Sequence, residues 1–177
     1  NISIRDELGK EIRKAFVAQE GYHLLSADYS QIELRMLAHM ANEDHMIKAF
    51  NEGLDIHTKT ATLIFNCSPE EVDEHKRRIA KTVNFGIVYG QTEFGLSSQL
   101  NITRKEAGEF MKMYFESYPK IHEYMNQLIE FCKENGYVET LFHRRREIPE
   151  INDKNFMTRE FGKRAAMNAP IQGSAAD

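Results

Sequence analysis

Apolar residues recur at helical spacing along most of the chain. Between residues 32 and 41 they fall three or four positions apart, which predicts an amphipathic helix directly after a short extended segment. Further helices are predicted over residues 44–51 and 56–65. Because alternating patterns are few and short, the chain predicts a helix-rich α+β fold with a small antiparallel sheet.

Capping signals place the next two helices. The run Ser-Pro-Glu-Glu at residues 68–71 combines a capping residue, a proline suited to the first helical position and the carboxylate of a capping box, so a helix is predicted to begin there. Thr103 and Glu106 repeat the capping box before a helix that ends near Ser117.

Proline and glycine bound the helices of the last third of the chain. Pro119 opens a helix that Gly136 is expected to stop. A last helix covers about residues 158–168, and we expect Pro170 to kink it rather than end it.

Two segments carry strand signals. Residues 22–29 alternate in polarity after the turn residue Gly21. Residues 137–142 lead into a basic turn at residues 143–146, with a return toward Ile148. The second segment therefore predicts a β-hairpin.

The composition is that of an ordinary globular protein. Of 177 residues, 41% are hydrophobic and 28% are charged, and no apolar run approaches the roughly 20 residues that cross a bilayer, so no membrane partner is expected. Cys67 and Cys132 lack metal-ligand spacing and are interpreted as free thiols in the cytoplasm. Both ends of the chain are expected to be cut points in a longer polypeptide.

The charge distribution bears on whether the protein could bind nucleic acid. A formal net charge of −4 argues against binding nucleic acid through bulk positive charge, although it leaves local contacts open. Basic residues cluster at residues 75–81, 143–146 and 159–164. Taken alone, each cluster is interpreted as a solvated surface.

Asp28 stands at the end of the first predicted strand, just before a helix. A carboxylate held at the rim of a sheet suits a hard cation such as Mg²⁺. The alternative is that Asp28 or Ser30 simply caps the helix. Glu33 lies in the first helical turn, where a carboxylate interacts favourably with the helix dipole in any case.

Four side chains form the most specific pattern in the chain. Arg77, Lys81, Phe85 and Tyr89 are each four residues apart, so on an α-helix they form one slowly drifting stripe about 18 Å long. The cations lie at one end and the rings at the other. This order matches a nucleoside triphosphate, because cations hold phosphates while rings pack against sugar and base.

An amphipathic helix with the two rings in its core would give the same spacing. However, the opposite side of this helix already supplies core residues: Ile79, Val83, Ile87 and Val88. Gly86 and Gly90 beside the rings each cost about 1 kcal/mol in a helix interior and allow another surface to approach. The stripe is therefore interpreted as a ligand-binding face.

Four segments resemble motifs of the family A DNA polymerases. Residues 28–35 read DYSQIELR and resemble the first palm motif, and residues 77–90 read RRIAKTVNFGIVYG and resemble the motif of the fingers helix. Residues 136–146 (GYVETLFHRRR) and 164–177 (RAAMNAPIQGSAAD) resemble the segments that contact template and primer. The motifs occur in the family's order, and the resemblance covers essentially the whole chain.

The resemblance implies roles for the residues around the metal and the sugar. Asp28 would bind the catalytic Mg²⁺ ions, and the backbone carbonyl of Tyr29 would add an oxygen ligand. Glu33 would lie against the sugar of the incoming nucleotide and hydrogen-bond Tyr89, which leaves no room for a 2′-hydroxyl. Tyr89 would also guard the position of the templating base.

The resemblance implies further roles toward the triphosphate and the DNA. His57, Arg77 and Lys81 would hold the triphosphate, Lys81 also being a candidate catalytic proton donor to the leaving pyrophosphate. Phe85 would pack on sugar and base. The residues that would read primer and template in the minor groove are Arg164, Asn168 and Gln172. Contacts there check pairing geometry without choosing sequence.

The resemblance also divides the chain into parts of a right-hand polymerase. Residues 1–55 would belong to the palm, residues 56–135 to the fingers, and residues 136–177 to a return into the palm. The last palm motif, with the second metal-binding aspartate, is expected beyond Asp177, and the thumb N-terminal to the chain. His143 stands where many family members have glycine, which leaves the turn type of the hairpin open.

The function implied for the parent protein is template-directed DNA synthesis through a two-metal phosphoryl transfer, in replication and repair. Its partners would be primer-template DNA, deoxynucleoside triphosphates and the remaining polymerase domains, in the bacterial cytoplasm beside the nucleoid. The chain alone holds an incomplete two-metal site and is expected to be inactive.

Two rival functions stay open at this point. One is a nucleotide or nucleic-acid binding module without catalysis, against which the intact Asp28, Glu33 and Lys81 argue. The other is a helical interaction protein without a ligand. That function would need a buried aromatic stripe, so the exposure of Phe85 and Tyr89 decides it.

Overall fold

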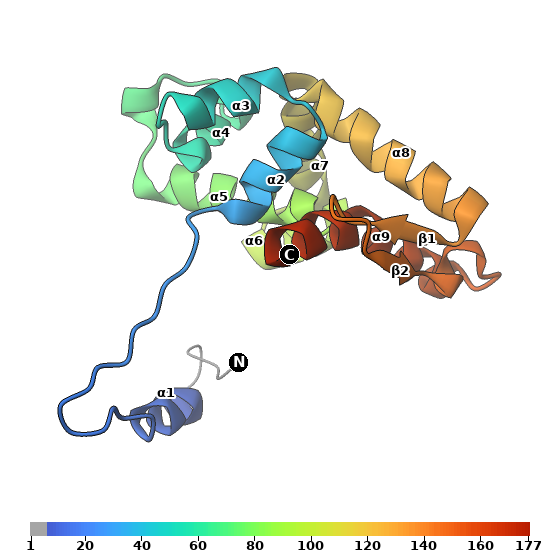
Figure 1. The fold of residues 1–177 in the computed structure, drawn as a ribbon. Coiled ribbons are helices and arrows are strands. Elements are labelled where there is room, and N and C mark those ends of the chain that lie inside the picture. The colour runs from blue at the N-terminus through green and yellow to red at the C-terminus, as the bar shows by residue number, and fades with distance from the viewer. Residues whose placement is uncertain (1–6) are drawn as a thin grey trace. The chain divides into compact units, whose positions relative to one another are not determined.

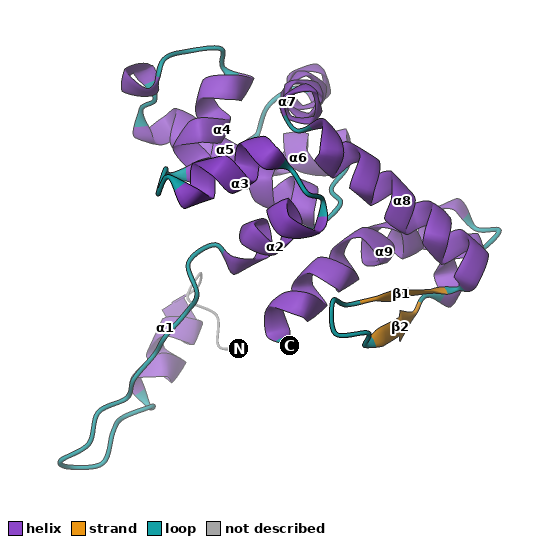
Figure 2. Ribbon diagram, turned by 45° about the horizontal axis from the view of Figure 1, so that its top comes forward, coloured by secondary structure: helices purple, strands orange, loops and turns teal. Residues whose placement is uncertain are grey.

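The computed structural model describes residues 7–177, which divide into two units. One unit extends to Ser30 and the other from Gln31 to Asp177. Figures 1 and 2 show helices throughout the second unit and one small β-hairpin, which confirms the helix-rich α+β class. No helix between residues 7 and 177 combines the length and the apolar character needed to cross a lipid bilayer.

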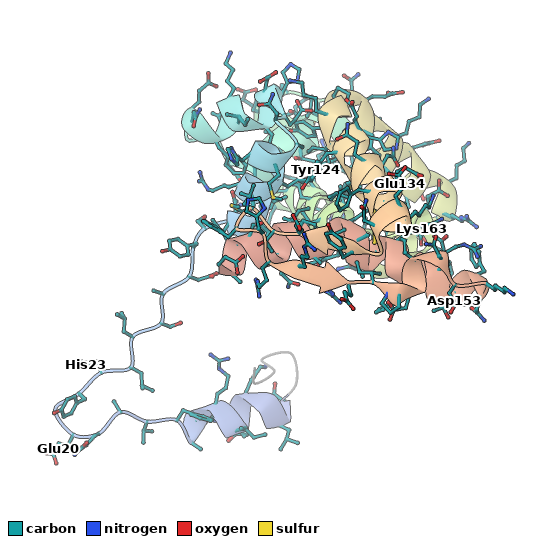
Figure 3. The ribbon with its side chains drawn as sticks, turned by 45° about the vertical axis from the view of Figure 1, so that its right-hand side comes forward. Glu20, His23, Tyr124, Glu134, Asp153 and Lys163 are labelled. Carbon is teal, nitrogen blue, oxygen red and sulfur yellow. The ribbon has the colours of Figure 1, made fainter. Side chains whose placement is uncertain are left out.

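The first unit contains the helix α1 (Glu7–Lys14), which the apolar pattern did not predict. Its charged side chains form the ion pairs Glu7–Lys10 and Glu11–Lys14 at helical spacing. The segment that follows is extended and exposed, and Glu20 and His23 project from it (Figure 3).

The strand predicted over residues 22–29 is absent, so that prediction was wrong. A strand is defined by hydrogen bonds to a partner strand, and polarity alternation alone does not supply one. Among the described residues, the strands that pair are those of the hairpin near the C-terminus.

The second unit begins with three helices that match the predicted ranges: α2 (Ile32–Met40), α3 (Asp44–Asn51) and α4 (Ile56–Ile64). Carboxylate side chains cap the N-termini of α3 and α4. Glu43 accepts a hydrogen bond from the His45 amide at α3, and Asp55 accepts one from the His57 amide at α4. Glu43 is buried and also accepts from the Lys120 amide, which ties α3 to a helix far along the chain.

The capping box at Ser68 forms, but it starts one turn of 3-10 helix, η1 (Pro69–Glu71), and not a long helix. Val72 is extended, so the turn ends there. The long helix α5 (Glu74–Val88) begins behind Asp73, whose side chain accepts a hydrogen bond from the Lys76 amide. The prediction placed this helix start too early because the second cap follows so closely.

The next segment contains a helix that the sequence signals missed, α6 (Glu93–Leu100). Its glycine and its two adjacent serines have low helix propensity. Thr92 caps the helix by accepting a hydrogen bond from the Gly95 amide. The predicted helices that follow are confirmed: α7 (Arg104–Ser117) and α8 (Pro119–Asn135). Gly136 ends α8 in the left-handed conformation, as a C-terminal glycine does.

The hairpin pairs β1 (Tyr137–Glu139) with β2 (Arg145–Glu147) in antiparallel register, Val138 opposite Arg146. His143 sits in its turn with φ 62°, the left-handed conformation that glycine adopts without strain. The histidine therefore adopts a backbone conformation that favours glycine.

The chain ends with the 3-10 turn η2 (Pro149–Asn152) and the helix α9 (Phe156–Ala176). α9 continues through Pro170, as expected, although it is longer than the predicted range. The Ser174 hydroxyl donates to the Pro170 carbonyl oxygen at 2.6 Å.

Two buried clusters hold the second unit together. The larger cluster contains buried residues from the successive helices between α2 and α8, among them Leu34, Met46, Ile56, Val83 and Tyr114. The smaller joins α8, the hairpin, η2 and α9 around Cys132, Val138, Ile148, Ile151 and Ala166. Burial at about 25 cal/mol per Å² of apolar surface makes these contacts the main source of stability.

We predict that Gly162→Ala in α9 lowers the free energy of unfolding by about 1 to 3 kcal/mol. A β-carbon there would lie 2.8 Å from the backbone of Glu150 and Ile151, so α9 would have to move away from η2. The measurement is urea denaturation followed by circular dichroism.

The matched control is Gly95→Ala in α6, where the nearest atom to the new β-carbon lies at 3.8 Å. This variant should gain about 0.5 to 1 kcal/mol, because alanine restricts the unfolded chain and favours the helix. Equal effects of the two substitutions would contradict the close packing of α9 on η2.

Candidate nucleotide-binding site

The stripe predicted on α5 faces away from the core. The opposite face of the helix is buried through Ile79, Ala80, Val83, Asn84 and Ile87. Arg77 and Lys81 are exposed, Phe85 is half-buried, and Tyr89, the first residue after the helix, is 42% exposed. The buried stripe that a helical interaction protein would need is therefore not present.

The two rings of the stripe lie against each other. Their centroids are 6.2 Å apart with an interplanar angle of 21°. The ring of His57 from α4 also lies beside Phe85, with 6.0 Å between the ring centroids. An aromatic surface therefore continues from α4 along α5 to Tyr89.

At the cationic end of the stripe, Arg77 makes an ion pair with Asp55, Nε to Oδ2 at 2.5 Å. Asp55 also accepts from the Thr58 hydroxyl at 2.8 Å and the His57 amide at 3.2 Å. Partial burial would raise the pKa of Asp55, but these hydrogen bonds outweigh it and hold the pKa at about 2. Asp55 is therefore an anion at neutral pH.

Lys81 differs from Arg77 in having no protein partner among residues 7–177. Its ammonium group lies one helical turn beyond the Arg77–Asp55 pair. Lys81 is therefore free to bind an anionic ligand.

His57 is 3% exposed and receives the buried side chain of Asn84, whose Nδ2 lies 3.0 Å from Nδ1 of the ring. Burial lowers the pKa of His57 to about 4; the charge of Asp55 opposes this shift, and those of Arg77 and Lys81 add to it. The imidazole is therefore neutral at pH 7, so it meets a ligand as a hydrogen-bonding group without charge.

At the aromatic end, the Tyr89 hydroxyl donates to Glu33 Oε2 at 3.1 Å. This is the hydrogen bond that the resemblance implied, and it joins α2 to the end of α5. Burial, together with the charge and hydrogen bond of Glu33, raises the pKa of Tyr89. The phenol therefore remains a donor at neutral pH.

Two of the predicted DNA-contacting residues of α9, Arg164 and Asn168, lie at the C-terminal end of α5. Asn168 Nδ2 donates to the Val88 carbonyl oxygen at 3.3 Å, at the last residue of α5. Gly90 follows with φ 63°, and a β-carbon there would lie 2.6 Å from Met167 and 3.3 Å from Arg164. The end of α5 and the middle of α9 are therefore in close contact, which only glycine permits at position 90.

Gln172, the third of these residues, lines a basic hollow of about 550 Å³ between α9 and the hairpin. Arg144 binds the Asp177 carboxylate at 2.6 Å, and Arg145 binds Glu139 at 2.6 Å and stacks over Tyr137 at 4.4 Å. Arg146 has no partner in the described part of the chain. Cationic groups therefore line one wall of this hollow, beside Gln172.

The two residues predicted to bind metal, Asp28 and Tyr29, belong to the first unit and are exposed. The N-cap position of α2 is Gln31, which makes no side-chain capping bond. Between residues 7 and 177, no group of three or more His, Cys, Asp or Glu side chains could hold a metal ion.

Sequence reasoning missed two residues of the site, Asp55 and Asn84. Asp55 stands at the N-cap position before α4, a pattern that is visible in the sequence. Asn84 is a polar residue at a core position of α5, between Ala80 and Ile87. A buried amide at such a position requires hydrogen-bond partners, which is a usable signal.

Known proteins match the chain over its whole length. It is 57% identical to DNA polymerase I of Geobacillus stearothermophilus and 53% identical to that of Bacillus subtilis, each alignment covering 100% of the chain and 20% of the relative. The POL domain of Pol1 from M. smegmatis, in complex with DNA primer-template and dNTP, superposes with a TM-score of 0.86 at 41% identity, over 99% of this chain and 31% of that one.

The chain thus spans about a fifth of the length of the curated relatives it matches. The family model of DNA polymerase family A matches residues 1–177. The site assembled from α2, α4, α5 and α9 lies within the matched sequence. The chain belongs to DNA polymerase family A.

Proposed function

We propose that the protein that carries this chain is a DNA-directed DNA polymerase, which adds deoxynucleotides to a primer 3′ end. One observation carries the proposal. The exposed face of α5 has cations at one end and aromatic rings at the other, and the aromatic end is hydrogen-bonded to two other helices: Tyr89 to Glu33 of α2, and Val88 to Asn168 of α9. A nucleotide-binding face therefore abuts a helix with the family's DNA-contacting pattern. Family membership supports the same function.

The incoming nucleotide would lie along the stripe. Lys81 and Arg77 would bind the triphosphate with charge-assisted hydrogen bonds, and His57 would contribute a neutral one. Phe85 would pack on sugar and base, because its ring neighbours those of both His57 and Tyr89. The length of the stripe, about 18 Å, accommodates an extended nucleotide.

In the reaction, the oxygen of the primer 3′-hydroxyl attacks the α-phosphorus and the pyrophosphate leaves. Lys81 is exposed, unpaired within the described residues and placed at the phosphate end, so it is the candidate to give a proton to the pyrophosphate. His57 is a poor candidate, since its pKa of about 4 leaves the ring neutral at pH 7, without the acidic proton of an imidazolium to transfer.

The duplex would lie over α9 and the hairpin. Arg164, Asn168 and Gln172 follow each other at four-residue spacing, so they form one row along α9 that would contact base edges in the minor groove. The arginines of the basic hollow beside Gln172 would contact backbone phosphates. Such local contacts are compatible with a net charge of −4.

Mg²⁺ is the cofactor that this function implies. The carboxylate of Asp28 and the carbonyl of Tyr29 are oxygen donors of the kind that Mg²⁺ prefers, and both residues are exposed. When bound, the ions would neutralise charge on the phosphates. Two ions held side by side need further carboxylate ligands besides Asp28, so we propose that the rest of the parent protein supplies the second aspartate, together with the remaining palm and the thumb.

We predict that Lys81→Ala in the parent polymerase raises the KM for deoxynucleotides roughly ten- to hundredfold, the loss expected for a charge-assisted contact to phosphate. The dissociation constant of primer-template DNA should stay within about twofold. The measurements are steady-state primer extension and DNA binding by fluorescence anisotropy.

The matched control is Arg78→Ala, on the same helix but off the stripe, where the guanidinium contacts His75. This variant should change neither constant by more than about twofold. Equal losses of nucleotide and DNA affinity in Lys81→Ala would remove Lys81 from the triphosphate site.

We predict that Glu33→Ala relaxes the exclusion of ribonucleotides by about tenfold or more, because the side chain occupies the space of a 2′-hydroxyl. Glu33→Gln keeps that volume and should retain most of the exclusion. Tyr89→Phe removes the hydrogen bond to Glu33 and should give an intermediate value. The measurement is the ratio of kcat/KM for deoxynucleotides and ribonucleotides.

A different result would assign Glu33 another role. If Glu33→Ala abolished turnover of deoxynucleotides at saturating Mg²⁺ while folding normally, Glu33 would be a metal ligand and not a sugar-excluding group.

A further inference from the structure

We propose that Asn84 is a positioning residue that fixes His57 as the neutral tautomer with its proton on Nε2, so that the imidazole donates a hydrogen bond to the triphosphate. The inference rests on the proposed function in one respect only, the identity of the acceptor. The tautomer itself is a property of the folded protein.

A buried chain of hydrogen bonds connects α4 and α5. The Thr60 hydroxyl of α4 lies 3.1 Å from Asn84 Oδ1, and Asn84 Nδ2 lies 3.0 Å from His57 Nδ1. Thr60 and Asn84 are both 0% exposed. Water therefore does not compete for these groups, and each polar atom depends on its protein partner.

The directions of these bonds determine the tautomer. In the structure Asn84 Oδ1 accepts a hydrogen bond from the Thr60 hydroxyl, and Nδ2 of the same amide faces the imidazole. An amide nitrogen only donates hydrogen bonds, which means that Nδ1 accepts and carries no proton. In a neutral imidazole the proton is then on Nε2.

The other ring nitrogen is available to a ligand. The buried side-chain nitrogen and oxygen atoms without a partner, among residues 7–177, are Gln91 Oε1 and the hydroxyls of Tyr114 and Tyr118. Nε2 of His57 is not one of them and has no protein partner in that range, so it reaches solvent. The charged groups that act on the ring are Asp55, Arg77 and Lys81.

A fixed tautomer matters because the two forms present opposite groups to a phosphate. The form with a proton on Nε2 offers a donor, whereas the other form offers a lone pair that an anionic oxygen repels. A neutral donor beside two cations also avoids the burial of a third positive charge. Asn84 thus acts on the ligand through His57, without touching it.

Packing alone does not explain an asparagine at this position. The neighbours of Asn84 on the buried face of α5 are apolar, and an apolar side chain of similar size would bury no amide. Asn84 Oδ1 bonds Thr60 and Nδ2 bonds His57, both from α4, so both polar atoms of the side-chain amide have hydrogen-bond partners.

The first test reads the tautomer directly. The parent polymerase is labelled with ¹⁵N-histidine, and long-range ¹H–¹⁵N correlation spectra are recorded without nucleotide or DNA. The His57→Gln variant assigns the signal. We expect the wild type to show a protonated Nε2 and an unprotonated Nδ1. In Asn84→Asp the carboxylate accepts from Nδ1, so the proton should move to that nitrogen.

The second test reads the consequence for nucleotide use. In Asn84→Asp the KM for deoxynucleotides should rise about tenfold at pH 8, with kcat within about threefold. The new carboxylate raises the pKa of His57, and the imidazolium formed at lower pH donates from both nitrogens. The ratio of variant to wild-type KM should therefore fall as the pH is lowered from 8 to 6.

A purely structural role would not produce that pH profile. The double variant His57→Ala/Asn84→Asp should show the KM of His57→Ala alone and no additional dependence on pH. Additive losses in the double variant would overturn the proposal.

If Asn84→Asp does not fold, Thr60→Val tests the same chain of bonds. It frees the amide of Asn84 to rotate, so the spectrum should show a mixture of tautomers and the KM should rise a few-fold. The matched control is Thr62→Val on the same helix, whose exposed hydroxyl donates to the Lys59 carbonyl oxygen and should leave both readouts unchanged.

The outcomes separate this inference from the proposed function. A wild-type protein that extends no primer but shows the proton on Nε2 would refute the polymerase function and keep the tautomer. A wild-type spectrum with the proton on Nδ1, or an even mixture, would overturn the role of Asn84 whatever the activity.

Discussion

The division of α5 into a buried face and a free face is the constraint on which the site depends. Val83, Asn84 and Ile87 are fixed in the core by α2, α4 and α7, so the rotation of the helix about its axis is set. With the rotation set, the side chains at four-residue spacing from Arg77 to Tyr89 must lie on the other side. The exposed stripe of α5 therefore needs no separate scaffold, since the packing that stabilises the unit also orients it.

The end of α5 is where distant parts of the sequence meet. Glu33 from α2 accepts from Tyr89, and Asn168 from α9 donates to Val88. Gly90 makes this junction possible, because its left-handed backbone brings the chain within reach of Arg164, where a side chain would collide. On the proposed function, the group that would bound the sugar pocket and the row that would face the duplex therefore share one support. Movement of α9 relative to α5 would alter both together.

Local signals in the sequence predict the ends of a helix well where a capping residue starts it or a glycine stops it. Thr103 with Glu106 starts α7, and Gly136 ends α8, because each satisfies backbone groups that any helix leaves open. The strand predicted over residues 22–29 failed because pairing is not local. The site follows the same rule: the spacing of the stripe is visible in the sequence, whereas the contacts of Asp55 and Asn84 depend on α4 packing beside α5.

The two cations of the stripe are not equivalent, and this shapes how a triphosphate would bind. Arg77 is paired with Asp55, whose pKa of about 2 keeps it ionised, so a phosphate must compete with a bound carboxylate for the guanidinium. Lys81 is exposed and, among the described residues, has no such competitor. On the proposed function, Lys81 therefore takes the first phosphate contact and Arg77 joins at the cost of its pair with Asp55. Asp55 also caps α4 and holds the amide of His57, so its position does not depend on Arg77. On the same proposal, the carboxylate would remain in place when the arginine turned to the ligand, and it would pair with the arginine again once pyrophosphate had left.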